Sequence, residues 1–140
     1  MDLNYYDTFI AVSSDCPAER GIVPPEKKSG RTKARIEYEL IANHPYTYTQ
    51  EELLYQTYLL HKEISAEEAA AREPELREAF FAKSHACLRA SMLPKKYGWG
   101  LHFDVQGRVA LVARESADYE TFLEGGNGRI KVLPAMRNRR

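Results

Sequence analysis

A period-two pattern of apolar residues in the C-terminal half of the chain constrains the fold more than any other feature of the sequence. Trp99, Leu101 and Phe103 alternate with smaller or polar residues, and the alternation resumes at Val109 after a connection that ends near a glycine. Such alternation is typical of a strand with one buried face, and a glycine in a short connection is typical of a hairpin. The sequence therefore predicts two antiparallel strands, with the indole on the buried face and His102 on the opposite one.

The middle of the chain carries the start signals of helices. Thr32, Thr49 and Ser65 can cap helices, and a glutamate follows the last two after three residues, which is the capping-box pattern. Pro74 interrupts the segment after Ser65. We therefore predict helices over residues 32–43 and 49–62, followed by two short helices or one kinked helix. The buried stripe of the second helix follows the expected spacing at Leu53, Leu54, Thr57, Tyr58 and His61.

Shorter segments complete the expected fold. Residues 8–12, 87–91 and 130–133 have the composition or the alternation of strands, and Ser116 can cap a short helix. The order of these segments predicts an α+β fold, in which an antiparallel sheet of four or five strands has three to five helices packed mainly on one face. The second face is expected to carry His102 and the side chains of residues 87, 89 and 91.

Length and composition bound the organisation of the chain. A chain of 140 residues with 44% apolar residues can form a single domain over residues 1–140 with its own core. Residues 13–31 hold three prolines and two glycines and are predicted to form a long loop, and residues 134–140 form a basic C-terminal tail. The long loop also suggests a protein-interaction module that docks through it.

Charge and cysteine usage exclude several classes of protein. Lys+Arg and Asp+Glu are equal at 20 each, so there is no strong nucleic-acid signal. No apolar run approaches the length of a membrane span, and the N-terminal residues lack the pattern of a signal peptide. Cys16 and Cys87 are too few for a disulfide framework, which favours a cytoplasmic location.

A basic stretch gives the first candidate site. Residues 79–103 contain no acidic residue, whereas residues 50–78 are rich in glutamate. Cations interleaved with aromatic rings can bind an anion and stack on a planar group, and Gly98 and Gly100 would permit a close approach of the backbone. We therefore predict a site for an anionic small molecule or partner; its candidate residues are Arg89, Lys95, Lys96, Tyr97, Trp99 and His102. The alternative is that the glycines only permit a bend and that the lysines are solvated.

Cys87 and His102 form the second candidate site, which would make the protein an enzyme. On adjacent strands the imidazole could activate the thiol as a nucleophile, with Asp104 or Arg89 as its orienting group. The alternative is that Cys87 is a small buried apolar residue. A metal centre built from Cys16, His85, Cys87 and His102 lacks the close ligand pairs of a zinc site, so neither a metal nor a cofactor is predicted.

Several short segments resemble those of a known family. They are residues 9–12 (Phe-Ile-Ala-Val), 15–17 (Asp-Cys-Pro) and 93–100 (Leu-Pro-Lys-Lys-Tyr-Gly-Trp-Gly). The chain resembles a family of small bacterial single-domain proteins that is classed only as a domain of unknown function. This resemblance implies a bacterial intracellular protein and assigns neither an activity nor a catalytic residue.

Overall fold

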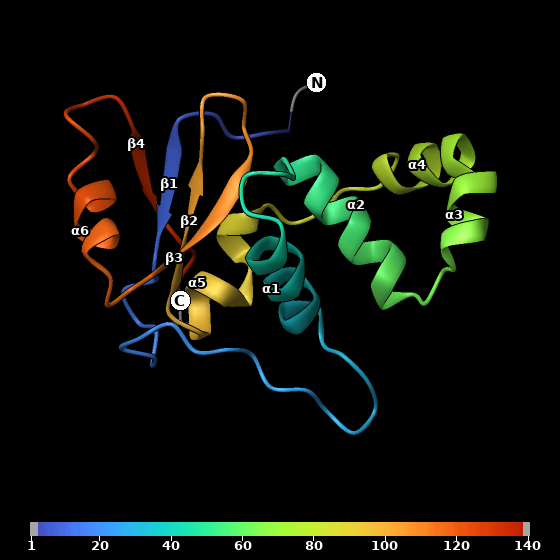
Figure 1. Ribbon diagram of the computed structural model, residues 1–140, viewed down its shortest axis with the longest axis horizontal. Helices are drawn as coiled ribbons and strands as arrows, with labels where there is room; N and C mark the ends of the chain where they lie inside the picture. Colours follow the sequence, from blue (N-terminus) through green and yellow to red (C-terminus); the bar gives the residue numbers. More distant parts are fainter. Residues whose placement is uncertain (1–2, 139–140) are drawn as a thin grey trace.

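The computed structural model describes residues 3–138 and contains a four-stranded sheet with helices on both faces (Figure 1). The strand order is β3-β2-β1-β4. The strands are β1 (Thr8–Ala11), β2 (Trp99–Phe103), β3 (Val109–Ala113) and β4 (Lys131–Pro134). β2 and β3 form the predicted hairpin, in which Leu101 lies opposite Leu111. The α+β class is therefore confirmed.

The expectation of a purely antiparallel sheet is wrong at one edge. β1 pairs antiparallel with β2 but parallel with β4. Helix α6 (Ala117–Leu123) connects β3 to β4 across one face of the sheet. Such a crossover returns the chain to the end of the sheet where β3 began, so β4 runs in the same direction as β3. Because β1 and β3 are both antiparallel to β2, β4 is also parallel to β1. The sequence predicted both the helix and the last strand, but it did not predict this direction.

The helices begin where the capping residues indicated. The hydroxyls of Thr32, Thr49 and Ser65 accept hydrogen bonds from the backbone N–H groups three residues later, at 3.2, 3.3 and 3.1 Å. Pro74 stands in the first turn of the fourth helix, which explains the break before it. The helices that precede the hairpin are α1 (Lys33–Asn43), α2 (Gln50–His61), α3 (Ala66–Ala71), α4 (Glu73–Phe81), the 3₁₀ helix η1 (Leu88–Ala90) and α5 (Met92–Lys96).

The strand expected over residues 87–91 does not exist. These residues form η1 and the cap of α5, in which the Ser91 hydroxyl accepts a hydrogen bond from Leu93 N at 3.1 Å. Pro94 lies in the first turn of α5, where its missing N–H removes no helical hydrogen bond. The alternation over residues 87–91 therefore belongs to a tight turn. With α5, residues 3–138 contain six α-helices, whereas the sequence predicts three to five.

Two apolar layers cover the two faces of the sheet. On one face, Leu101 and Phe103 are fully buried against residues of α1, α2 and α5, with Trp99 at the edge of this cluster. On the other face, Phe9 and Val112 pack against Tyr119 of α6. Figure 1 shows α6 on one side of the sheet and α1 and α5 on the other, with α3 and α4 farther out beside α2. The alternation of buried faces along β2 is confirmed.

The first part of the segment 13–31 packs closely on β2. The indole Nε1 of Trp99 donates to Ile22 O, and Ile22 N donates to Tyr97 O, both at 2.8 Å. Pro24 is fully buried, whereas residues 25–31 are exposed. Because the N-terminal half of the segment is occupied by contacts within the chain, it offers little free backbone to a partner.

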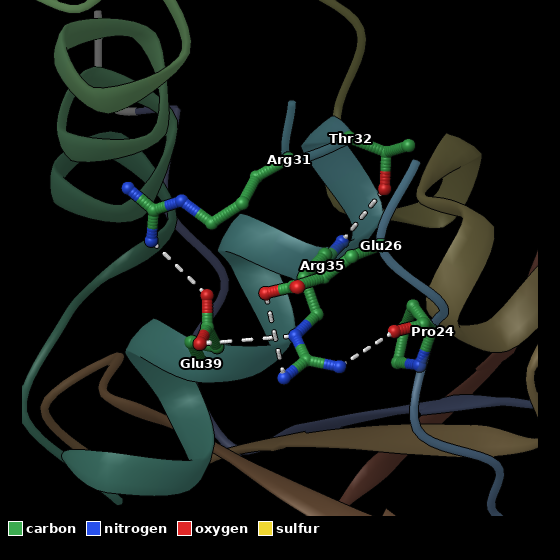
Figure 2. A network of polar contacts seen from close by, with 6 residues as sticks. All are labelled: Pro24, Glu26, Arg31, Thr32, Arg35 and Glu39. Atoms are coloured by element: carbon green, nitrogen blue, oxygen red, sulfur yellow. Dashed lines mark hydrogen bonds and ion pairs between the residues drawn. The ribbon is translucent and has the colours of Figure 1, made fainter. Parts of the chain in front are cut away.

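A cluster of polar contacts centred on Arg35 holds the rest of this segment against α1 (Figure 2). The guanidinium donates to Pro24 O at 3.0 Å and lies 3.9 Å from Glu26 and 3.7 Å from Glu39. Glu39 also pairs with Arg31 at 3.1 Å. Two side chains of α1, Arg35 and Glu39, thus contact the two ends of residues 24–31.

Replacing Arg35 should release this segment. We expect Arg35→Met, which keeps the apolar stem, to lower the free energy of unfolding by about 1.5 kcal/mol, the scale of a hydrogen bond to a charged group. Trypsin should cleave the variant faster at Lys27 and Lys28. Arg72→Met is the matched control, because Arg72 makes two exposed ion pairs away from the segment. Equal cleavage rates for both variants would contradict this role of Arg35.

The C-terminal segment is docked as far as it is described. Ala135 is buried, Met136 N donates to Arg89 O at 2.8 Å, and the side chain of Asn138 donates to Lys95 O at 2.8 Å. Residues 139 and 140 of the predicted basic tail lie outside the described residues. Between residues 3 and 138, no helix combines the length and the apolar content that crossing a membrane requires.

Candidate functional site

A cavity of about 370 Å³ lies between α1, α2 and the segment that joins α4 to α5. Its walls are mainly apolar, with Leu54 and Tyr58 from α2, Phe80 from α4 and Leu88 from η1. A volume of this size lies within the range of pockets that enclose small organic molecules. The polar groups that line it therefore decide what the cavity can do.

Glu37 is the first of these polar groups. Its side chain comes from the buried stripe of α1 and the residue is only 8% exposed. Ser91 Oγ donates to Glu37 Oε1 at 2.8 Å; among residues 3–138, Oε2 makes no hydrogen bond. Burial raises the pKa of Glu37 to about 7, although the Ser91 hydrogen bond and the nearby charge of Lys33 act in the opposite direction. A carboxyl of this kind exchanges a proton near neutral pH.

Thr57 is the second polar group. It lies in the interior of α2, is 3% exposed, and lines the same cavity. A helical threonine ordinarily satisfies its hydroxyl at the carbonyl one turn earlier. Among the described residues, however, the buried Thr57 Oγ1 has no hydrogen-bond partner. A buried hydroxyl without a partner is costly, so this atom is available to a polar group of a ligand.

Cys87 lines this cavity as well, but its polar neighbour is Tyr5. Burial, followed by a hydrogen bond with Cys87, raises the pKa of Tyr5 to about 12. Tyr5 packs on Phe103 with ring centroids 5.3 Å apart, which places this pair on the α1 side of the sheet. His85 also lines the cavity, where its Nε2 donates to Phe80 O at 2.6 Å.

His102 lies on the opposite side of the sheet from Cys87. Its ring stacks on Phe122 of α6 at 4.1 Å, and a hydrogen bond of 2.8 Å joins its Nδ1 to Tyr46 Oη. Burial lowers the pKa of His102 and raises that of Tyr46. The structure therefore does not bring the thiol and the imidazole together, because the adjacent strand that would have carried Cys87 is absent.

The other residues of the predicted anion site are dispersed and partly engaged. Arg89 Nε donates to Pro134 O at 2.8 Å, Trp99 is bonded to Ile22, and Lys96 is exposed. None of Arg89, Lys95, Lys96, Tyr97, Trp99 and His102 lines the cavity between α1 and α2. Anion binding by this set stays a prediction.

The two glycines beside Trp99 do permit close approaches, but both involve the chain itself. A Cβ at Gly98 would overlap the backbone of Arg20, and a Cβ at Gly100 would lie 2.5 Å from the ring of Phe9. The space that the sequence suggested for a ligand is therefore filled by residues of the same chain. Within the described residues, no group of three His, Cys, Asp or Glu side chains gathers as a metal site would require.

The pattern of the sequence carries a partial signal for the cavity. It predicts Thr57 on the buried stripe of α2, and this position is confirmed, whereas His61 at the end of the same stripe is exposed. Glu37 was not identified, although it lies three residues after Ala34 and four before Ile41, both of which are buried on α1. A charged residue in register with a buried stripe was the signal that could have located it.

Comparisons with known proteins assign no function to this cavity. One family model matches residues 1–140, whereas no curated protein and no solved structure matches the chain.

Proposed function

We propose that this chain, which belongs to the family of unknown function (DUF6157) that the matching model describes, binds a small organic molecule in the cavity between α1 and α2. Membership of this family assigns no activity. This proposal keeps the ligand-binding role expected from the sequence and moves it to other residues. Neither the pairing of Cys87 with His102 nor the exposed part of residues 13–31 offers a comparable arrangement.

One observation carries the proposal. A mainly apolar cavity is lined by the buried residue Thr57, whose hydroxyl has no hydrogen-bond partner among the described residues, and by the buried residue Glu37, which accepts a hydrogen bond from Ser91. Structural polar groups in a core are nearly always satisfied, since an unmet hydroxyl costs about 1–3 kcal/mol. Unsatisfied groups that line an apolar cavity are therefore typical of a site that a ligand completes.

The arrangement sets the chemistry of recognition. Ser91 donates to one oxygen of Glu37, which leaves the other oxygen to carry the proton of the neutral acid. Glu37 can then donate a hydrogen bond below about pH 7 and accept one above it. Thr57 can do either. Tyr58 and Phe80 supply the apolar contacts for a ring or a short chain.

A thermal-shift screen of small polar aromatic and aliphatic compounds tests this proposal. We expect several compounds to raise the Tm of the wild-type protein, and Ala86→Trp to abolish these shifts, because Ala86 is exposed and lines the cavity. Ala70→Trp is the control for an added indole, since Ala70 is an exposed residue of α3. Shifts that persist in Ala86→Trp would place binding elsewhere and contradict the proposal.

Thr57→Val should separate stability from binding. Valine has nearly the same shape without the hydroxyl, so we expect the free variant to be more stable by about 1 kcal/mol. The same variant should bind the compounds found in the screen several-fold more weakly, because the partner of their polar atom is lost. Denaturant unfolding and a titration measure the two effects. A variant that is less stable and binds equally well would show that Thr57 has no role in a site.

We also propose a reducing, cytoplasmic setting for the protein. Cys16 and Cys87 are both free thiols in the structure, as a reducing compartment would require.

A further inference from the structure

Two lysines and a histidine gather at one end of the cavity. Lys33 stands at the start of α1, and His61 and Lys62 stand at the end of α2. All three are exposed. Within residues 3–138, none of them has a carboxylate within 4 Å. The positive charge at this end of the cavity is therefore held in no ion pair within 4 Å, although the charge of Lys33 acts on Glu37 one turn away.

A second hollow, of about 500 Å³, adjoins this end. Lys33 and His61 line both hollows, and Arg31 and Glu63 line only the second one. Arg31 is already paired with Glu39, and Glu63 is the one carboxylate among the described residues that line this hollow. Lys33 is thus shared by the two hollows, Lys62 lines the first hollow, and Glu63 lines the second.

The position of Lys33 at the start of α1 is not explained by a favourable interaction with the helix dipole. A cation near the C-terminal end of a helix interacts favourably with the helix dipole, which accounts for Lys62 without any ligand. A lysine at the N-terminal end is unfavourable for the same reason, and the first turn of α1 contains no acidic residue. The start of α1 therefore carries a cation where the helix dipole favours an anion.

Two buried residues, Glu37 and Thr57, line the cavity one helical turn away from these basic side chains. Glu37 is on the same side of α1 as Lys33 but one turn further along, and Thr57 precedes His61 by one turn of α2. Tyr58 stands between Thr57 and His61 on α2, whereas Leu54 lies one turn before Thr57, and both line the cavity. The cavity thus presents cations at its rim, apolar walls, and hydrogen-bonding groups at its far end.

Building on the proposed function, we infer that the ligand is an amphipathic organic anion: a carboxylate or phosphate lies at Lys33 and Lys62, an apolar body packs against Tyr58 and Phe80, and a hydroxyl or carbonyl meets Glu37 and Thr57. The unpartnered hydroxyl of Thr57 fixes the polar end, and the unpaired Lys33 fixes the charged end. A cationic ligand would instead place its charge among like charges at the rim.

Three compounds with one phenol and different head groups test the inference. They are 4-hydroxyphenylacetate, its neutral amide and the cationic tyramine, each titrated at pH 7 and low salt by ligand-observed NMR. We expect the carboxylate to bind about tenfold more tightly than the amide, which corresponds to about 1.4 kcal/mol from one favourable charge contact. Tyramine should bind most weakly. Added salt should reduce the advantage of the carboxylate.

Variants at the rim complete the test. Lys33→Gln should remove most of the preference for the carboxylate over the amide. Lys131→Gln is the control, because Lys131 is an exposed residue of β4. An amide or amine that binds the wild type as tightly as the carboxylate would overturn the inference about charge while the proposed function stands. Failure of all three compounds at millimolar concentration would also overturn it, whereas the compound screen judges the proposed function separately.

Discussion

Glu37→Gln should make the protein more stable at pH 8 by about 3 kcal/mol and leave its stability near pH 4.5 unchanged. The pKa of Glu37 is raised from 4.5 to about 7 by burial, so the folded protein binds a proton here that the unfolded chain has already released. The carboxylate therefore destabilises the wild type as the pH rises from about 4.5 to about 7, and the deficit persists above that range. Glutamine removes the charge and can still accept the hydrogen bond from Ser91.

Urea unfolding between pH 4.5 and pH 8 measures this difference. Other titratable groups line the cavity, and they are shared by both proteins; they are Lys33, Tyr58, His61, Lys62, His85 and Cys87. The difference between the two profiles therefore isolates Glu37. Glu78→Gln is the control, since Glu78 is an exposed residue of α4. Parallel profiles for wild type and Glu37→Gln would show that the carboxyl is not buried as described.

Gly98→Ala should destabilise the protein by about 3 kcal/mol. Gly98 has a φ of +74°, a conformation that costs an alanine about 1–2 kcal/mol, and the new Cβ would overlap the carbonyl of Arg20. Overpacking against backbone adds about 1–3 kcal/mol. Because Trp99 is the one tryptophan of the chain and bonds to Ile22, displacement of residues 20–22 should shift its fluorescence to longer wavelength.

The control for this variant is Gly128→Ala. Gly128 has a similar φ of +82°, but a Cβ there would have no neighbour within 4 Å. The difference in the free energy of unfolding between the two variants therefore measures the overlap with Arg20 alone. Equal losses, with unchanged tryptophan emission in Gly98→Ala, would contradict the close packing of residues 20–22 on β2.

Local signals in the sequence predicted most elements of the fold. The caps at Thr32 and Thr49 and the alternation beginning at Trp99 depend on interactions within a few residues, and the structure confirms them. The parallel pairing of β1 with β4 depends on the path of α6 across the sheet, which no local pattern specifies. The strand predicted over residues 87–91 is wrong for a related reason, because their alternation is too short to distinguish a strand from a 3₁₀ turn.

The candidate site was harder to predict because it depends on packing between helices. Glu37 and Ser91 are far apart in sequence, and only the packing of α1 against the cap of α5 brings them to 2.8 Å. Composition predicts a binding site instead in the acid-free stretch around Gly98. A close approach does occur there, but it is made by the backbone of Arg20 of the same chain. Unpaired charge along a sequence was therefore a weaker guide than a polar residue on a buried stripe.

The central claim is that the cavity between α1 and α2 binds a small organic molecule, and methyl NMR of the labelled protein tests it most directly. Titration with the best compound from the screen should shift the methyl resonances of Leu54, Leu88 and Met92, which line the cavity. The methyls of Val112, which faces α6 on the other side of the sheet, should stay unchanged. Shifts confined to Val112 and its neighbours, or saturable binding with no change at Leu54 and Leu88, would contradict the account.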